Sequence, residues 1–259
     1  MLKQISFLCL LALSTVLSAC VDSHDLNQKS AKNYQRIVEQ MEMFGIVDHD
    51  SATATRVQTV FARLQQTANK YNDSGQALDW RITVFRSPEV SAWTMPGGKM
   101  IVYSSLVEKL RLNDDELSII LAHEMAHVIK EHGKAQLNVN RATRLLSVFG
   151  GAAISSAVNY AGSALALAPE YAITRPFSRA KELEADRIGL LLMAESGYNP
   201  QAAMRLWRKL YEFAGDGDTQ GFLQRIRDTH PGYAEREANI QTVFPQALAL
   251  YQQNRLNKP

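Results

Sequence analysis

The chain has 259 residues, of which 46% are hydrophobic and 21% charged, and its 28 basic and 26 acidic side chains give a formal net charge of +2. This length and composition favour a globular protein with one core or two closely joined ones. A charge so close to neutral argues against a nucleic-acid-binding protein.

The first twenty residues have the pattern of an export signal. Lys3 precedes an apolar run over residues 5–16, and the run leads into "LSAC", residues 17–20. Such a run is too short for a stable membrane span. "LSAC" resembles a bacterial lipobox, in which cleavage leaves a lipid-modified cysteine. We therefore expect a signal peptide over residues 1–19 and lipidation at Cys20; the alternative is an ordinary secreted protein with a free cysteine.

The residue after Cys20 bears on the location. Bacterial lipoproteins retained in the inner membrane carry an aspartate there, whereas this chain has Val21. The resemblance therefore implies a periplasmic protein, lipid-anchored in the outer membrane. Because Cys9 is discarded and Cys20 acylated, the mature chain has no disulfide and no thiol ligand. Metal ligands must then come from His, Asp and Glu.

The rest of the chain divides into a tether and one domain. Residues 20–45, with the polar stretch "VDSHDLNQKSAKN", are interpreted as a lipidated N-terminus and tether, and residues 46–259 as the domain. Apolar side chains at helical spacing over residues 53–71 predict an amphipathic helix. Strands are predicted over residues 80–85, 91–95 and 99–104, and "PGG" between the last two predicts a hairpin.

The next helix is marked at both ends. Asn113 is suited to cap its first amides, with Glu116 reaching back, and Gly133 is a plausible stop. This helix of about twenty residues contains "HEMAH", residues 123–127. The small sheet next to it offers an edge to an extended peptide.

Three further segments follow. Residues 145–168 carry no charge, but Gly, Ser, Asn and Ala dilute their apolar character. We expect an uncharged, loosely helical insertion on the protein or against the membrane surface rather than a membrane span. Helices are predicted over residues 177–197 and 199–213, the second with Asn199 as its cap.

The "HEMAH" helix has the geometry of a metal site. At about 100° per residue, His123 and His127 lie about 40° apart and reach one ion. A catalytic zinc takes a third protein ligand, here a carboxylate or another histidine. Glu124 is placed to act as general base on a zinc-bound water. Downstream, Glu182 and Asp186 share one helix face, whereas Glu184 is rotated by about 200° from Glu182 and should face elsewhere.

"HEMAH" followed by "KELEAD", residues 181–186, resembles the M48 family of zinc metallopeptidases, the OMA1, HtpX and CAAX prenyl protease group. Within it, the chain is similar to the periplasmic lipoprotein branch of BepA-like proteins. The resemblance implies an α+β, mainly helical, zincin-like domain with a small sheet edge beside the "HEMAH" helix. It implies one zinc per chain, held by His123, His127 and Glu182, with Glu124 as the base and Asp186 orienting a zinc-bound histidine.

Other candidates near the site are more ambiguous. A histidine in the matching "HP" of BepA-like relatives lies near the zinc, which makes His230 a candidate extra or switch ligand; the alternative is a histidine that caps the turn before Pro231. Arg236 steadies that loop, polarises the substrate or forms a surface salt bridge. His132, about 140° around the helix from His127, is expected to be structural.

The resemblance implies a zinc metalloendopeptidase of the bacterial cell envelope that cleaves unfolded or misassembled outer-membrane proteins by attack of a Glu-activated, zinc-bound water. One alternative is a largely latent, chaperone-like assembly factor for outer-membrane proteins. Another is a structural lipoprotein with a chance motif. The expected partners are envelope protein substrates, the membrane through the lipid on Cys20, and the outer-membrane assembly machinery, without nucleic acid.

Overall fold

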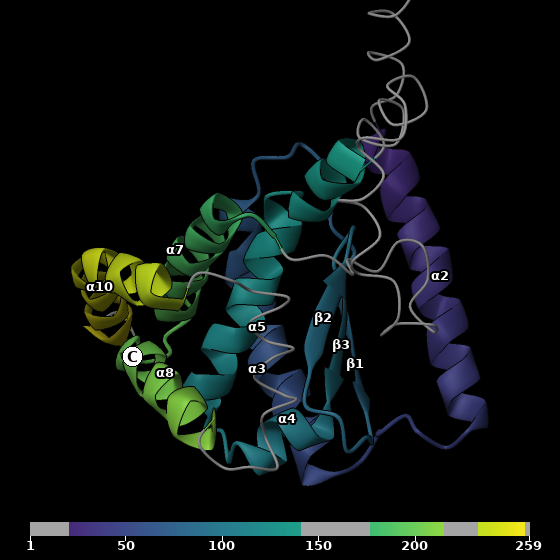
Figure 1. Cartoon of the computed structure of the whole chain (residues 1–259), viewed down its shortest axis with the longest axis horizontal. Helices are drawn as coiled ribbons and strands as arrows, with labels where there is room; N and C mark the ends of the chain where they lie inside the picture. The colour runs from purple at the N-terminus through teal and green to yellow at the C-terminus, as the bar shows by residue number, and fades with distance from the viewer. Residues whose placement is uncertain (1–20, 141–176, 215–232, 257–259) are drawn as a thin grey trace, which may run out of the picture.

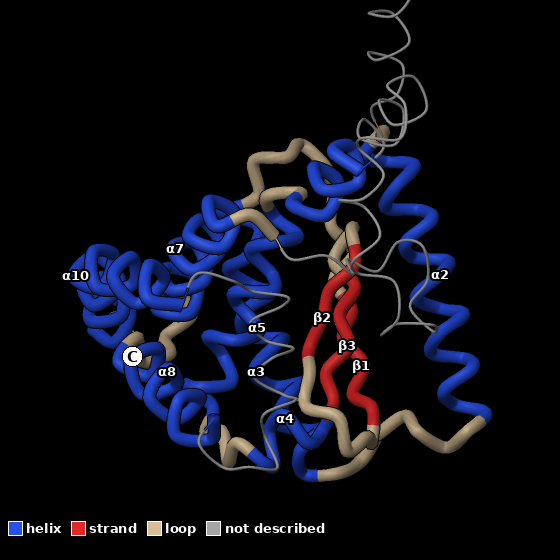
Figure 2. Tube along the Cα trace, viewed as in Figure 1, coloured by secondary structure: helices blue, strands red, loops and turns tan. Residues whose placement is uncertain are grey.

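The computed structural model describes residues 21–140, 177–214 and 233–256, which form helices around one small sheet (Figures 1 and 2). The strands are β1 (Arg81–Phe85), β2 (Ala92–Met95) and β3 (Lys99–Tyr103). The helical elements are α2 (Ser23–Met43), α3 (Ala52–Ala68), the 3-10 turn η1 (Asn69–Tyr71), α4 (Ser104–Lys109), α5 (Asp114–Ile129), α7 (Arg179–Glu195), α8 (Gln201–Ala214) and α10 (Tyr233–Leu256). The predicted α+β, mainly helical class is confirmed.

The sheet has the order β1-β3-β2. β2 and β3 pair antiparallel, as the hairpin prediction requires, and β1 runs parallel to β3. Between the paired residues Met95 and Lys99, Gly97 and Gly98 have φ angles of 80° and 91°. Only glycine adopts such angles without strain, so the glycines of "PGG" permit the turn.

Successive side chains of the central strand serve two different cores. Met100 and Val102 face the main core, which α3 and α5 share, whereas Ile101 faces a smaller cluster under α2. This is the period-two alternation of a strand with both faces covered. Figure 1 shows α2 along one face of the sheet and α3 and α5 on the other.

Helix α2 corrects the interpretation of the N-terminal segment. The sequence predicts a tether over residues 20–45, but within it residues 23–43 form a helix, and Asp22 Oδ1 accepts the Asp25 amide at 3.0 Å to cap it. Leu26 and Tyr34 are buried on its sheet-facing side, and the Tyr34 hydroxyl lies 2.5 Å from Thr83 Oγ1 on β1. The prediction of a tether is therefore wrong for these residues, because a sparse set of apolar positions suffices to dock the helix. A domain boundary at residue 46 stays a prediction.

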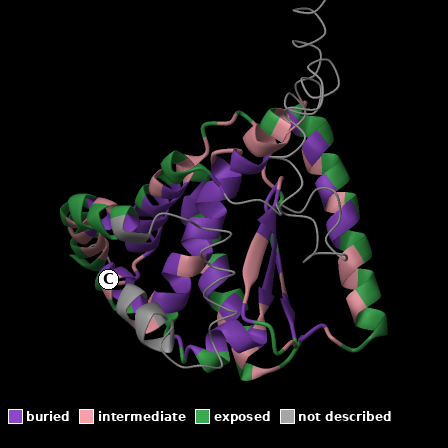
Figure 3. Cartoon of the chain, in the orientation of Figure 1, coloured by how far each residue is buried: buried purple, intermediate pink, exposed green. Residues whose placement is uncertain are grey.

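Helix α5 is the central element of the main core. The predicted capping box is present: Asn113 Oδ1 accepts the Glu116 amide at 2.9 Å, and Glu116 Oε2 accepts the Asn113 amide at 3.0 Å. The helix is buried along most of its length (Figure 3). It ends at Ile129, not at the predicted stop Gly133, and a second helical segment covers residues 132–140.

Helices α7, α8 and α10 cover the side of α5 away from the sheet (Figure 1). α7 contacts both α5 and α10. Asn199 Oδ1 accepts the Gln201 amide at 3.0 Å, in agreement with its predicted capping role at the start of α8. The predicted core face of α3 is also present, with buried Val57, Val60, Phe61 and Leu64.

Several predictions fall outside the described residues. These are the signal peptide over residues 1–19, lipidation of Cys20, the uncharged insertion at residues 145–168 and the switch ligand His230. Within the described ranges, no helix combines the length and apolar character needed to cross a membrane.

Candidate metal centre

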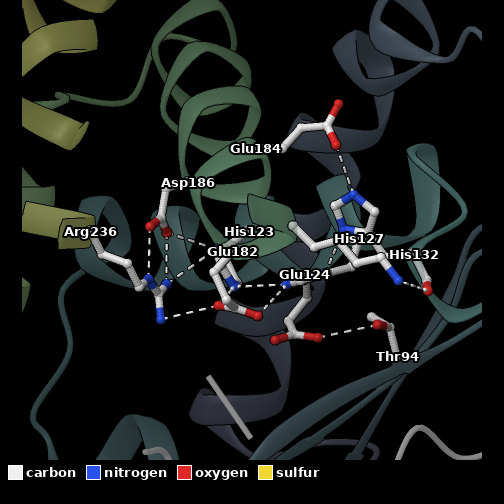
Figure 4. Close-up of polar contacts among 10 residues, drawn as sticks. Thr94, His123, Glu124, His127, His132, Glu182, Glu184, Asp186 and Arg236 are labelled. Carbon is white, nitrogen blue, oxygen red and sulfur yellow. Dashed lines mark hydrogen bonds and ion pairs between the residues drawn. The ribbon is translucent and has the colours of Figure 1, made fainter. Parts of the chain in front are cut away.

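Three side chains from two helices meet in the interior (Figure 4). His123 and His127 lie one turn apart on α5, and their Nε2 atoms are 3.0 Å apart. Glu182, in the first turn of α7, places its two carboxylate oxygens 3.4 Å from the Nε2 atoms of His123 and His127, respectively. All three residues are buried, and each offers a ligand atom within 4.8 Å of the others.

The close packing of α5 on α7 brings Glu182 to the histidines. A β-carbon at Gly189 would lie 2.9 Å from the backbone nitrogen of His123 and 3.0 Å from its Cα. Real β-carbons essentially never make contacts this short, so glycine at position 189 allows the two helix backbones to approach. The position of the third candidate ligand thus depends on a residue two turns further along α7.

The donor set fits a transition-metal ion. Two imidazole nitrogens and one carboxylate oxygen are the three protein ligands of a frequent type of catalytic zinc site, which keeps a fourth position for water or substrate. The described residues therefore contain a complete three-ligand set.

Asp186 and Arg236 form a second layer behind His123. Asp186 Oδ1 lies 2.9 Å from His123 Nδ1, and both Asp186 oxygens accept hydrogen bonds from Arg236 at 2.7 Å. Arg236 Nη1 also lies 3.2 Å from Glu182 Oε2. Arg236 is only 5% exposed, so the interpretation of this residue as a surface salt bridge is wrong. Its position on α10 ties a third helix to the site.

These contacts fix the charges around His123. Burial and the Arg236 guanidinium lower the pKa of His123, but hydrogen bonds to Asp186 and Glu182 outweigh both and raise it to about 9. Burial raises the pKa of Asp186, but the charge and hydrogen bonds of Arg236 hold it below its usual value. Asp186 is thus a carboxylate that accepts the Nδ1 proton of His123 and leaves Nε2 turned to the ligand cluster.

Glu124 is anchored to the edge of the sheet. The Thr94 hydroxyl, on β2, donates a hydrogen bond of 3.1 Å to Glu124 Oε2, and both residues are buried. β2 is an outer strand of the sheet and contacts α5. The expected sheet edge beside the "HEMAH" helix is therefore present, and it supplies Thr94, a site residue that the sequence analysis did not identify.

A second group of residues surrounds His127. His132 Nδ1 lies 2.9 Å from His127 Nδ1, and His132 Nε2 lies 3.0 Å from Glu184 Oε2. Phe177 stacks on the His127 ring, with centroids 4.0 Å apart and planes 16° apart. Burial lowers the pKa of His132 despite the nearby Glu184 carboxylate. Glu184 does face away from the ligand cluster, as predicted, but it faces His132.

The structure therefore brings together all five residues that the sequence analysis placed in one centre: His123, Glu124, His127, Glu182 and Asp186. Their individual roles in catalysis stay predictions. A mainly helical domain with such a set on two packed helices and a small sheet beside them is a zincin-like metallopeptidase domain.

The comparison with known families gives the same class. The model of Peptidase family M48 matches residues 51–243, and the chain belongs to this family. It is 32% identical over 170 residues to mitochondrial metalloendopeptidase OMA1 of Schizosaccharomyces pombe, covering 66% of this chain and 48% of that protein. The chain thus spans about half the length of that relative.

Two bacterial relatives are matched over more of their length. Metalloprotease LoiP of Escherichia coli (strain K12) is 27% identical over 251 residues, which cover 92% of this chain and 96% of LoiP. Metalloprotease YcaL of the same organism is 27% identical over 194 residues, which cover 75% of this chain and 74% of YcaL. The M48 resemblance seen in "HEMAH" and "KELEAD" is confirmed.

Proposed function

We propose that this protein is a zinc-dependent metalloendopeptidase. The observation that carries the proposal is the buried convergence of His123, His127 and Glu182 beside Glu124. Membership of family M48 and the metalloprotease names of its relatives support the same reaction class. Zinc is the proposed ion because two imidazoles and a carboxylate are among its preferred catalytic ligand sets.

When bound, zinc would lower the pKa of a coordinated water to about 7 and polarise the scissile carbonyl. Glu124 accepts a proton from the attacking water, whose oxygen bonds to the carbonyl carbon. Glu124 then gives that proton to the amide nitrogen as the carbon–nitrogen bond breaks, so that a carboxylic acid and an amine leave. The Thr94 hydroxyl on β2 holds one oxygen of the Glu124 carboxylate by its hydrogen bond.

The substrate is proposed to bind as an extended peptide along β2. Within the described sheet, β2 has β3 on one side and no strand on the other. Backbone amides and carbonyls at such an edge pair with a peptide of any sequence, which suits an enzyme that acts on unfolded chains. Thr94, which holds Glu124, belongs to this same strand.

We further propose that the enzyme acts in the bacterial envelope, anchored by a lipid on Cys20 to the periplasmic face of the outer membrane. The N-terminal sequence pattern supports this location. The Val21 amide donates to Asn138 Oδ1 at 2.8 Å, and Leu26 and Asn27 line a small pocket together with Thr94 and His127. A lipid at residue 20 would thus hold the site close to the membrane surface, where misassembled membrane proteins are its proposed substrates.

The test is a Glu124→Gln variant, with Glu108→Gln at an exposed position as the matched control. We expect the wild type and both variants to bind about one zinc per chain, measured by elemental mass spectrometry. Glu124→Gln should cleave unfolded casein at least about a hundredfold more slowly, because it lacks the general base. Equal cleavage by Glu124→Gln and the wild type would contradict the proposal.

The burial of Glu124, which is 6% exposed, supports a second candidate function. In this alternative the site is largely latent and the protein assists the assembly of outer-membrane proteins as a chaperone. A Glu124→Gln strain with a normal envelope, beside a deletion strain with envelope defects, would favour the assembly factor. Equal defects in both strains would favour the peptidase.

A further inference from the structure

His132 reaches the centre through a change of direction at the end of α5. The helix ends at Ile129, and Glu131 has a φ of 49°, in the left-handed region that few residues other than glycine adopt. The chain therefore does not continue along α5, and His132 turns back onto His127. The two ring centroids are 4.9 Å apart, and both side chains are almost completely buried.

The hydrogen-bonding partners determine which nitrogen carries each proton. His132 Nε2 lies 3.0 Å from a carboxylate oxygen of Glu184, which can only accept, so Nε2 carries a hydrogen. The other nitrogen of a neutral His132 ring is then an acceptor. Because His132 Nδ1 lies 2.9 Å from His127 Nδ1, His127 must donate this bond.

With its proton on Nδ1, His127 has Nε2 available to bind a metal. A neutral His127 with its proton on Nδ1 has a lone pair on Nε2, the atom that faces His123 and Glu182. Phe177, stacked on the ring, restricts its tilt. One hydrogen bond and one stacking contact thus set both the tautomer and the plane of the His127 imidazole.

We infer that His132, held by Glu184, is the positioning residue for the zinc ligand His127. The inference rests on the proposed zinc site, although not on peptide cleavage. The two candidate histidine ligands are then oriented in different ways: Asp186 and Arg236 hold His123, whereas a second imidazole and a half-exposed carboxylate hold His127. His132 and Glu184 lie outside the three-ligand group and act on it through His127.

The experiment measures the zinc dissociation constant of the full chain by competition with a chelator. His132→Leu removes the acceptor and should weaken zinc binding by about 10- to 100-fold, the usual effect of losing such a partner. His132→Asn places a carboxamide oxygen near the position of Nδ1 and should recover most of the affinity. Glu184→Leu should weaken binding by a smaller factor. The matched control Arg187→Leu replaces another exposed charged side chain of α7 and should bind zinc like the wild type.

A second measurement separates positioning from general stability. The visible absorption bands of the Co²⁺-substituted protein depend on ligand geometry, so they should change in His132→Leu and return towards the wild type in His132→Asn. We also expect kcat to fall in His132→Leu with little change in KM. A merely structural histidine would change thermal unfolding without this pattern.

The outcomes decide the inference separately from the proposed function. A folded His132→Leu with wild-type zinc affinity and cobalt spectrum would overturn it. If His132→Leu does not fold, Glu184→Leu decides the question, because the Glu184 side chain is 47% exposed and its replacement leaves the core intact. If Glu184→Leu then binds zinc as tightly as Arg187→Leu does, the inference is overturned. A wild type that binds zinc but cleaves no peptide would contradict the peptidase and leave the positioning result standing.

Discussion

The buried guanidinium of Arg236 balances an unusual concentration of negative charge. Asp186 and Glu182 contact it directly, and Glu124 lies near enough to add to its electrostatic field. Burial lowers the pKa of Arg236, but these carboxylates more than compensate and raise it. Before metal binds, Arg236 therefore contacts both Asp186 and Glu182 and offsets the repulsion between these two carboxylates.

The variant Arg236→Lys tests this role, since lysine keeps the charge but lacks the planar fork that both Asp186 oxygens accept. We expect zinc affinity to fall by about tenfold. We also expect the free energy of unfolding of the metal-free protein to fall by about 1–3 kcal/mol. Chelator competition and urea unfolding measure the two effects.

Arg179→Lys is the matched control. Arg179 pairs with Glu235 at 3.1 Å, but their side chains are 69% and 53% exposed, so the effect on stability should stay below about 0.5 kcal/mol. If Arg236→Lys were as mild as Arg179→Lys in both measurements, the guanidinium would not organise the site.

The sequence predicted those site residues whose geometry is set within one helix. His123 and His127 lie on one face of α5, and Glu182 and Asp186 on one face of α7, because helical periodicity alone places them. It failed for His132, which was placed by extending α5 as a single straight helix past Ile129. The left-handed residue Glu131 interrupts that helix, and nothing in the periodic pattern marks such an interruption.

At the scale of elements, the contact between α5 and α7 determines the spacing of the metal ligands. Gly189→Ala should force the helices apart, because the new β-carbon would lie within about 3 Å of the His123 backbone. Alanine favours a helix over glycine by about 1 kcal/mol, whereas overpacking costs about 1–3 kcal/mol, so we expect net destabilisation. Zinc affinity should fall as Glu182 moves from the histidines. Urea unfolding measures the change in stability, and chelator competition measures the change in zinc affinity.

Arg187→Ala serves as the control for helix propensity, since Arg187 is an exposed residue of the same helix. Its free energy of unfolding should change by less than about 0.5 kcal/mol. A Gly189→Ala protein that is more stable than the wild type and binds zinc equally well would show that the contact between α5 and α7 accommodates a β-carbon.

The start of α3 depends on a buried carboxylate. Asp48, whose side chain is 2% exposed, accepts hydrogen bonds from the Ser51 hydroxyl at 2.7 Å and from Arg86 at 3.0 Å. Ser51 in turn caps the Ala54 amide of α3. Burial raises the pKa of Asp48, but these hydrogen bonds and the Arg86 charge hold it below its usual value. Folding thus favours the ionised carboxylate.

Asp48→Asn should lower the free energy of unfolding by about 1–2 kcal/mol at pH 7. Because the folded pKa is lowered, this contribution is present above the unfolded value of about 3.9 and is lost as the pH falls through the folded value. The difference between wild type and variant should therefore shrink below about pH 4. Urea unfolding at pH 7 and pH 3 measures it.

Asp50→Asn is the control, because Asp50 also pairs with Arg86 but is 86% exposed. It should have little effect at either pH. A difference between Asp48→Asn and the wild type that stayed constant down to pH 3 would mean that ionisation of Asp48 does not stabilise the fold.

At the scale of the whole molecule, the sequence predicted individual layers better than their assembly. The hairpin of β2 and β3 follows from one local turn, and the core face of α3 from its own spacing. The parallel pairing of β1 with β3 joins strands that are not consecutive in the chain, and no local pattern specifies it. Helix α2 was missed because most of its residues are polar, and its few apolar residues are buried only by contact with the sheet face that α2 itself covers.

Removing residues 1–45 tests whether α2 belongs to the domain. The truncation uncovers Phe85, Met95 and Ile101, and it removes the buried Leu26 and Tyr34 that α2 supplies. Each large apolar side chain contributes about 1.5–3 kcal/mol when buried, so the loss should be on the order of 5 kcal/mol or more. Typical domains have only about 5–15 kcal/mol in total. We therefore expect the shortened chain to bind a hydrophobic dye and to lose its cooperative thermal transition.

A chain that begins at Val21 and keeps α2 should unfold like the full-length protein. The variant Met43→Ser/Phe44→Ser is a further control, because these residues near the end of α2 are 79% and 67% exposed and their loss should hardly alter stability. If the chain from residue 46 unfolded cooperatively with the same free energy of unfolding as the full-length protein, α2 would not be part of the domain. The boundary predicted at residue 46 would then be correct. If the chain from residue 46 loses its cooperative transition while the chain from Val21 keeps it, α2 is instead the outer layer of the peptidase domain itself.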